Sequence, residues 1–321
     1  MSESRQSLKG EVPNQVPQDV LLSVCMITYN HERYIRQALD SVLAQQTDFN
    51  FEICIGEDDS SDTTRKICLE YADRYPEEIR LILRRREDVM YIDGKPTGRR
   101  NTIETNGACR GKYIALLEGD DFWIDPYKLQ KQFDYLEEHG DCSCVVGRVF
   151  RQNEVDSTRS QICPNLTEVG IRKNRHLISE TFNVHTCTMC YRNGGVDFGQ
   201  DVFQHAAAAD MLIMLFLTES GNYFYCDPGV LSVYRITGMG AWSSRGKADG
   251  IFQKIRIWEL YGAHLSGQPK VMVDQVIKRL HYEGDWGLID SKPKKLGELI
   301  RGFFCNFKTT VWFIKKRLLR W

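Results

Sequence analysis

The chain has 321 residues, of which 42% are hydrophobic and 26% are charged, and its formal net charge is −1. This length suits one large α/β domain with a smaller appendage, and the hydrophobic content is ordinary for a globular protein. The eleven cysteines are not spaced as a disulfide framework and follow no apolar signal sequence, which excludes a small secreted disulfide-rich fold and predicts reduced thiols in a cytoplasmic protein.

The first half of the chain alternates apolar strands with helices. Residues 1–19 are polar with two prolines and predict a flexible tail. Parallel strand pairing with right-handed crossovers is then expected, as in a nucleotide-binding half-sheet, from strands at 22–28, 51–55 and 79–83 and helices at 33–46 and 63–75. Because the chain has no GxGxxG motif and no P-loop, a Rossmann dehydrogenase or a kinase-like NTPase is disfavoured.

Four carboxylates follow the second expected strand, in the segment GEDDSSDTTRK: Glu57, Asp58, Asp59 and Asp62. They cannot all be helix caps, although Ser61 or Asp62 is expected to cap the next helix. The remaining carboxylates suit the hydroxyl and base N–H donors of a nucleotide. The sequence therefore predicts a nucleotide contact at this strand tip.

A charged loop over residues 84–100 and a short helix lead to a fourth strand, in the segment YIALLEGDDFWIDPYK, which ends in Glu118, Asp120 and Asp121. A turn needs only one such residue, and adjacent carboxylates repel one another unless a cation or donors neutralise them. A divalent metal is the expected occupant. Asp125 and Pro126 instead indicate the cap and first residue of a helix to His139.

The segment from Asn183 to Trp242 begins with the strand-like HTCTMCYR and then leads into a helix at Asp210. Cys187 and Cys190 have CxxC spacing, but no second pair completes a zinc site, so buried structural thiols are favoured. An Asp that opens a helix is ordinarily a cap or a charge near the positive end of the helix dipole. Taken alone, Asp210 is therefore interpreted as structural.

Four segments together resemble the family 2 glycosyltransferases of GT-A fold: SVCMITYNHERYIRQALDSVLAQ, GEDDSSDTTRK, GKYIALLEGDDFWIDPYKLQKQ and SVYRITGMGAWS. The resemblance covers roughly residues 21–244. It implies an α/β fold of GT-A type, with a Rossmann-like mixed sheet flanked by helices over residues 20–245. The donor half is expected at about 20–150, the acceptor half at 151–245, and a helical C-terminal extension at 246–321.

The same resemblance implies a metal-dependent, inverting transfer of a sugar from a nucleotide-sugar, expected to be a UDP-sugar, to a hydroxyl of a growing cell-surface glycan. Asp210 then matches the catalytic base. Glu118, Asp120 and Asp121 match the motif for Mn²⁺ or Mg²⁺, with Glu118 in the place of the usual Asp and acting through water. The nucleotide-sugar contacts implied are Thr28, Tyr29, Asn30, Glu57, Asp58, Arg99, Asn101, Asp120, Arg235 and Trp242.

One position departs from the family pattern. After YRI the family commonly has a His that meets the diphosphate or the metal, and here this position is Thr237. Threonine can donate a hydrogen bond but carries no charge. Either Arg235 or a distant cation compensates, or assistance to the leaving group is weaker.

Two other functions would explain part of this pattern. A sugar nucleotidyltransferase also uses acidic strand tips, but it would have a Gly-rich, basic first loop where this chain has TYNHERY. A non-enzymatic carbohydrate- or calcium-binding module would explain the carboxylates but would leave the nucleotide half-sheet and Asp210 without a role.

The end of the chain is strongly basic. Residues 292–321 hold nine Lys or Arg against one Glu, a net charge of +8, which leaves −9 on residues 1–291. Apolar residues at helical spacing predict an amphipathic interfacial helix over residues 295–321, too short and too charged to span a bilayer. Peripheral contact with the cytoplasmic face of a membrane is expected, the alternative being that the apolar stripe packs on the catalytic domain. The expected partners are a nucleotide-sugar and a glycan or lipid-linked glycan acceptor, with no nucleic acid.

Overall fold

The computed structural model describes residues 10–92, 94–154, 159–163, 169–179, 184–206, 209–219, 221–238 and 247–290. The chain divides into two compact units, one ending at Ser243 and the other beginning at Ser244. This division lies two residues before the boundary expected from the sequence.

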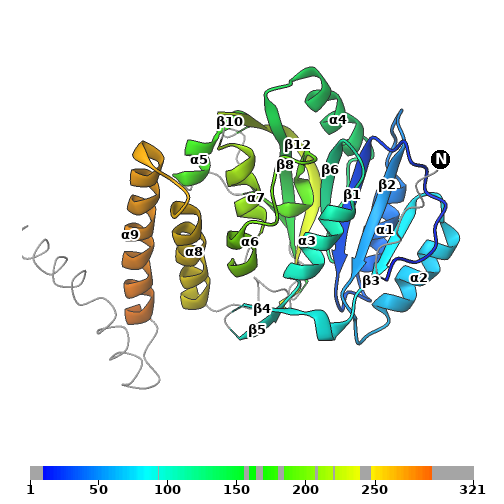
Figure 1. Cartoon of the computed structure of the whole chain (residues 1–321), viewed down its shortest axis with the longest axis horizontal. Coiled ribbons are helices and arrows are strands. Elements are labelled where there is room, and N and C mark those ends of the chain that lie inside the picture. Colours follow the sequence, from blue (N-terminus) through cyan, green and yellow to red (C-terminus); the bar gives the residue numbers. More distant parts are fainter. Residues whose placement is uncertain are drawn as a thin grey trace, which may run out of the picture. The chain divides into compact units, whose positions relative to one another are not determined.

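The described residues of the first unit form a ten-stranded mixed sheet in the order β10-β12-β8-β11-β6-β1-β2-β3, with β7 paired to β12 and β9 paired to β8 (Figure 1). The strands are β1 (Leu22–Thr28), β2 (Phe51–Glu57), β3 (Ile79–Leu83), β6 (Tyr113–Glu118), β7 (Phe122–Trp123), β8 (Cys142–Asn153), β9 (Arg159–Cys163), β10 (Gly170–Lys173), β11 (Cys190–Arg192) and β12 (Tyr223–Ile236). β6, β1, β2 and β3 are parallel, which confirms the predicted βαβαβ arrangement. β11 runs antiparallel to both β6 and β8.

Helices cover both faces of this sheet. They are α1 (Ile35–Leu43), α2 (Thr64–Arg74), α3 (Arg99–Ala108), α4 (Lys128–Glu138), α5 (Asn174–Ile178), α6 (Asp201–His205) and α7 (Asp210–Leu217), with short 3₁₀ turns η1 (Arg86–Asp88) and η3 (Thr186–Thr188). Apolar faces of α1, α2 and α4 pack on alternate residues of β1, β2, β3 and β6 in one buried cluster. Residues of α3 bond to the opposite face, where Asn101 donates to the Gly56 carbonyl at 2.8 Å.

Three local expectations are corrected by the structure. The strand-like HTCTMCYR is a 3₁₀ turn followed by the three-residue β11. The charged loop contains a hairpin of β4 (Met90–Ile92) and β5 (Lys95–Thr97). The helix expected from Pro126 begins at Lys128, because Asp125 accepts a hydrogen bond from the Tyr127 N–H at 2.9 Å and so closes a turn before it.

The prediction of a flexible tail over residues 1–19 is wrong for the second half of that segment. Glu11 forms an antiparallel bridge with Ile82, and the Val12 N–H donates to the Leu81 carbonyl at 2.8 Å. The side chain of Glu11 also pairs with Arg80 at 2.8 Å. This segment therefore covers the open edge of β3, where backbone groups would otherwise lack partners.

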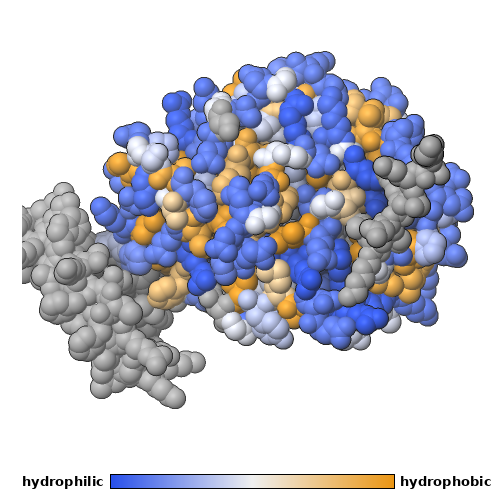
Figure 2. Space-filling view, viewed as in Figure 1, coloured by the Kyte–Doolittle hydropathy of each residue, from blue (hydrophilic) through white to orange (hydrophobic). Residues whose placement is uncertain are grey.

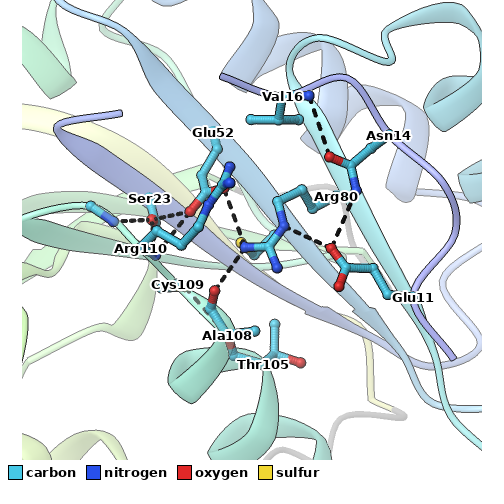
Figure 3. Close-up of polar contacts among 12 residues, drawn as sticks. Glu11, Asn14, Val16, Ser23, Glu52, Arg80, Thr105, Ala108, Cys109 and Arg110 are labelled. Carbon is cyan, nitrogen blue, oxygen red and sulfur yellow. Dashed lines mark hydrogen bonds and ion pairs between the residues drawn. The ribbon is translucent and has the colours of Figure 1, made fainter. Parts of the chain in front are cut away.

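Glu52 is the centre of a buried ionic network under this edge (Figure 3). Its carboxylate contacts Arg110 at 2.5 Å and Arg80 at 3.3 Å, and it accepts a hydrogen bond from the Ser23 hydroxyl at 2.7 Å. Burial alone would raise the pKa of Glu52, but the hydrogen bonds from Arg110 and Ser23 more than offset it, so this pKa is lowered. The ionised form is therefore the stabilising one.

We expect Glu52→Gln to lower the free energy of unfolding by about 3–5 kcal/mol, because removing one partner leaves buried guanidinium charge without compensation. Since the folded pKa is depressed, the wild-type advantage is present above the unfolded pKa and is lost as the pH falls through the folded value. Urea unfolding at several pH values measures both effects.

The matched control for this experiment is Glu70→Gln, which removes an exposed ion pair with Arg36 at 2.7 Å. This substitution should change the free energy of unfolding by less than about 1 kcal/mol. Equal losses for the two variants would contradict the proposed importance of the Glu52 network.

The second unit contains α8 (Lys247–Gly262) and α9 (Gly267–Asp290), which pack against each other. Among the helices built from described residues, none is both long enough and apolar enough to cross a membrane. The amphipathic helix predicted for residues 295–321 lies outside the described residues.

Candidate active site

The tips of β1 and β2 are joined by side-chain bonds. Asn30 follows β1 with φ of 55°, a left-handed conformation that is uncommon for a residue other than glycine. Its N–H donates to the Ser60 hydroxyl at 2.9 Å, and its side-chain oxygen accepts from the Ser61 N–H at 2.9 Å. At the end of β1, buried Thr28 bonds through its hydroxyl to His31 Nδ1 at 3.2 Å. Left-handed backbone conformations like that of Asn30 are often found at functional sites.

An aromatic ring, a cation and a carboxylate meet beside these tips. The Arg86 guanidinium lies over the Tyr29 ring, 4.2 Å from its centroid, and donates to Asp58 at 2.9 Å. Burial raises the pKa of Asp58 to about 6, against the attraction of Arg86. A planar ring, a planar cation and a carboxylate acceptor are groups that stack on and hydrogen-bond to a nucleobase.

Two predicted contact residues are occupied in holding the loop. Fully buried Glu57 accepts from the Ser60 N–H at 2.7 Å and forms an ion pair with Arg65. Asn101 bonds to Gly56, where an added Cβ would lie 2.2 Å from the Asn101 side-chain oxygen, so only glycine permits this approach. These bonds fix the shape of the site from behind.

The predicted acidic cluster forms at the end of β6. Glu118 Oε2 is buried and has no hydrogen-bond partner among the described residues. Burial, followed by the charges of Asp120 and Asp210, raises the pKa of Glu118 to about 8, and burial likewise raises the pKa of Asp121 well above its usual range. His31 Nε2 lies 3.8 Å from Asp120 Oδ2. The carboxyl groups therefore lie close together, and the positive charge around them is too small to keep all of them ionised.

Arg235 ties this cluster to β12. Its backbone N–H donates to Asp121 Oδ1 at 2.7 Å, and its guanidinium donates to the Asp120 carbonyl at 2.6 Å. The guanidinium also contacts Glu154 at 3.3 Å and lies over the Phe122 ring at 4.4 Å. With only 5% of its surface exposed, Arg235 is placed to hold the acidic turn.

Asp210 begins α7, as predicted, and lies near the same cluster. Its carboxylate accepts from the Met211 N–H at 2.8 Å and faces the Thr186 hydroxyl at 3.5 Å. The Thr186 hydroxyl also opposes the rise in the pKa of Glu118. Burial raises the pKa of Asp210, while the charge of Arg99 opposes that rise. Thr186 thus links the acidic turn to the start of α7.

Arg99 begins α3 and is 5% exposed. Its guanidinium donates to the Ala206 carbonyl at 2.7 Å, and burial lowers its pKa to about 10. Ala206 lies in the segment between α6 and α7. Arg99 therefore supports Asp210 by its charge and by holding that segment.

The residues present can take part in binding a divalent metal. Among the described residues, no three His, Cys, Asp or Glu side chains are arranged to hold a metal ion by themselves. Magnesium, however, is usually bound by one or two carboxylates together with substrate phosphates. The unpartnered Glu118 Oε2 beside Asp120 and Asp121 offers oxygen donors of this kind.

Most of the predicted site residues come together at the carboxyl ends of β1, β2 and β6, while Trp242 lies outside the described residues. Three neighbours were not predicted: Arg86, Thr186 and His31. His31 lies in the TYNHERY segment, and its position just after the first strand could have identified it as a site residue. Arg86 and Thr186 carry no local signal that distinguishes them from other loop residues. Cys187 and Cys190 are buried free thiols.

Sequence comparisons show which proteins the chain resembles. The model of glycosyl transferase family 2 matches residues 23–194, more than half of the chain. The uncharacterized protein Rv1520 of Mycobacterium tuberculosis is 32% identical over 258 residues, which cover 79% of this chain and 68% of that protein. WfgD of Escherichia coli, named as a UDP-Glc:alpha-D-GlcNAc-diphosphoundecaprenol beta-1,3-glucosyltransferase, is 37% identical over 118 residues, covering 37% of this chain and 42% of WfgD.

Solved structures share the fold at low sequence identity. The S. aureus protein TarS in complex with UDP-GlcNAc superposes with a TM-score of 0.63 and 16% identity, covering 88% of this chain and 78% of TarS. The mannosyltransferase PcManGT of Pyrobaculum calidifontis, in complex with GDP-Man and Mn²⁺, gives a TM-score of 0.59 and 14% identity, covering 96% of this chain and 84% of PcManGT. The chain therefore belongs to glycosyl transferase family 2, has the GT-A fold and is a glycosyltransferase that uses nucleotide-sugar donors.

Proposed function

We propose that this glycosyltransferase moves a sugar from a UDP-sugar to a hydroxyl of a growing cell-surface glycan, with inversion at the anomeric carbon and with a divalent metal. The observation that carries the proposal is the meeting of two groups of side chains at one edge of the sheet. Asp58 with Tyr29 and Arg86 lies at the tip of β2, and Asp120 lies at the tip of β6. Asp210 approaches the second group through Thr186.

The first group is suited to uracil. Tyr29 offers its ring face, and the Asp58 carboxylate can accept a hydrogen bond from the base N–H. In this structure Arg86 contacts both Tyr29 and Asp58, so a base must either displace the guanidinium or stack against it. The named UDP-glucose donor of WfgD and the UDP-GlcNAc bound to TarS support a uridine nucleotide.

The second group is suited to the transfer itself. The Asp210 carboxylate can take the proton of the acceptor hydroxyl while that oxygen attacks the anomeric carbon from the face opposite the departing nucleotide. The bond from sugar to phosphate breaks in the same displacement, which inverts the configuration. Arg99 favours the ionised form of Asp210, which is the form that can act as a base.

The diphosphate that leaves must be stabilised as its charge grows. Asp120 and Asp121, with Glu118 through water, would hold a divalent cation, which when bound supplies positive charge to the diphosphate. Mn²⁺ in the PcManGT complex supports such a metal here. Thr237 offers no charge, and the structure adds His31, whose Nε2 lies 3.8 Å from Asp120 Oδ2, as a neighbour of this group. A lipid-linked glycan, as in the name of WfgD, is the proposed acceptor class.

The test is a panel of UDP-, dTDP- and GDP-sugars assayed for hydrolysis and transfer, with calorimetry of UDP in the presence and absence of Mn²⁺. A UDP-sugar should be the best substrate, and UDP affinity should require the metal. Preference for another nucleotide would refute the donor, and metal-independent activity would refute the metal. The anomeric configuration of the product, read by NMR, tests inversion.

The raised pKa of Asp58 predicts a pH effect on donor affinity. Because this pKa is about 6, the carboxylate is ionised at pH 7.5 and largely protonated at pH 5. A protonated carboxyl is a poorer acceptor for the base N–H, so Kd for the best UDP-sugar should rise by about tenfold between these two pH values. Asp58→Asn should bind weakly and without this pH dependence. An unchanged pH profile in the variant would exclude Asp58 as its source.

A further inference from the structure

A cavity of about 370 Å³ lies outside the groups already described, between α3, the end of β11 with the loop that follows, and α6. Its volume lies within the range of small-molecule sites. On the face of the molecule shown in Figure 2, apolar residues form small, separate areas among hydrophilic ones. Single exposed apolar residues of this kind need no partner. The cavity is therefore the stronger candidate for an additional ligand site.

The walls of the cavity are fixed by internal hydrogen bonds. The side-chain amide of buried Asn106 donates to the Tyr191 hydroxyl. The amide of Asn193 donates to the Gly111 carbonyl at 2.8 Å and to the Cys109 carbonyl at 3.3 Å. These bonds use the amide N–H groups, and each amide keeps a carbonyl oxygen that can accept further bonds. Because the wall is already ordered, a ligand that binds there does not have to order it, and binding costs less conformational entropy.

The lining residues indicate which ligand would fit. Asn106, Asn193, Asp197 and Gln204 bring amide and carboxylate groups, and Phe198 brings an apolar ring. None of the described residues that line the cavity is Lys or Arg, so a phosphate group would find no cation there. Hydroxyl groups bond to amides and carboxylates, and the apolar face of a sugar ring packs on an aromatic ring. This combination favours a neutral saccharide.

Gly107 leaves part of the cavity open. It lies inside α3, where glycine is less favourable than alanine by about 0.5–1 kcal/mol. Its φ is not positive, and a Cβ added there would meet no atom within 4 Å. Neither backbone conformation nor close packing within the chain therefore requires glycine at this position. Gly107 therefore lines the cavity without a side chain that would occupy it.

We propose that this cavity binds one neutral saccharide unit. Asn106 lies seven residues after Arg99 on α3, which is about 10 Å along the helix axis. Gln204 lies two residues before Ala206, whose carbonyl binds Arg99. The cavity is thus carried by the same helices that support Asp210. The cavity itself lies toward the amino-terminal end of β6, since Asn193 bonds to Cys109 and Gly111 before that strand, so the unit is a saccharide other than the one that reacts at the carboxyl ends of the strands.

The test uses the full chain and methyl glycosides of glucose, galactose, N-acetylglucosamine and rhamnose, followed by saturation-transfer NMR in the presence of saturating UDP and Mn²⁺. At least one glycoside should bind, and UDP should not displace it. Gly107→Leu, which fills the cavity from a helical position, should weaken that binding at least tenfold. Phe198→Ala should weaken it by removing the ring instead of filling the space.

The matched control is Gly250→Leu, the same change at a helical glycine of α8 whose added Cβ also meets no atom within 4 Å. It should leave glycoside binding unchanged. The proposal is overturned if no glycoside binds, if UDP displaces the glycoside, or if both cavity variants bind it normally. UDP binding and UDP-sugar hydrolysis, measured on the same samples, test the proposed function separately. If the wild-type chain binds a glycoside but shows neither of these activities, only the proposed function is refuted.

Discussion

Replacing Asp210 by Asn should lower kcat for transfer by about a hundredfold to ten-thousandfold, the usual range for loss of a general base. An amide cannot accept the proton of the acceptor hydroxyl, but it keeps the size of the side chain. Its oxygen can still accept from the Met211 N–H, as Asp210 does at 2.8 Å. Affinity for UDP with metal should therefore change little. Steady-state kinetics and calorimetry on the same sample separate the two quantities.

Asp201→Asn is the matched control for this variant. Asp201 also begins a helix, α6, but its side chain is exposed and pairs with His205 at 3.1 Å. This substitution should leave kcat within a factor of two or so, because exposed pairs contribute little. If Asp210→Asn transfers at a near-normal rate, or unfolds, then Asp210 is a structural residue and the base is another group.

Replacing Asp120 by Ala should abolish the metal-dependent part of donor binding. A divalent cation requires oxygen ligands, and a methyl group supplies none. The substitution also removes the carboxylate that lies 3.8 Å from His31 Nε2. In a thermal-shift experiment, UDP with Mn²⁺ should raise the Tm of the wild type and leave that of the variant almost unchanged, because a ligand stabilises only the state that binds it.

The control is Asp125→Ala, which removes a carboxylate of the same loop that is engaged with Lys131 at 2.6 Å. The stabilisation of this variant by UDP with Mn²⁺ should resemble that of the wild type. Unchanged stabilisation of Asp120→Ala would refute the assignment of Asp120 to the metal. Glu118→Gln should have a smaller effect if Glu118 acts through water.

The sequence could predict those parts of the fold and site that depend on local pattern. Apolar runs predicted β1, β2 and β3, and the start of α7 at Asp210 was also correct. Two acidic segments after apolar strands predicted that carboxylates would lie at one sheet edge, because the carboxyl ends of parallel strands meet there. The register of β1 with β2 and β6 places these tips together.

Other features depend on residues that are far apart in the chain. The Arg235 N–H bonds to Asp121 across 114 positions, and Arg99 bonds to Ala206 across 107. Neither contact has a local pattern, since each requires the sheet to bring β12 or α6 close to the first half of the chain. The N-terminal segment looked flexible for the same reason: its partners, Leu81 and Ile82, lie at a sheet edge that only the folded chain creates.

By itself, then, the sequence determined the βαβαβ half-sheet, the acidic strand tips and the helix that begins at Asp210, because strand and helix periodicity and the clustering of charge are local properties. Only the tertiary structure decided that Arg86 lies over Tyr29, that Thr186 faces Asp210, and that α3, β11 and α6 line a cavity. Burial and partner identity set the pKa of Asp58 and Glu118, and both depend on which distant residues pack around each carboxylate.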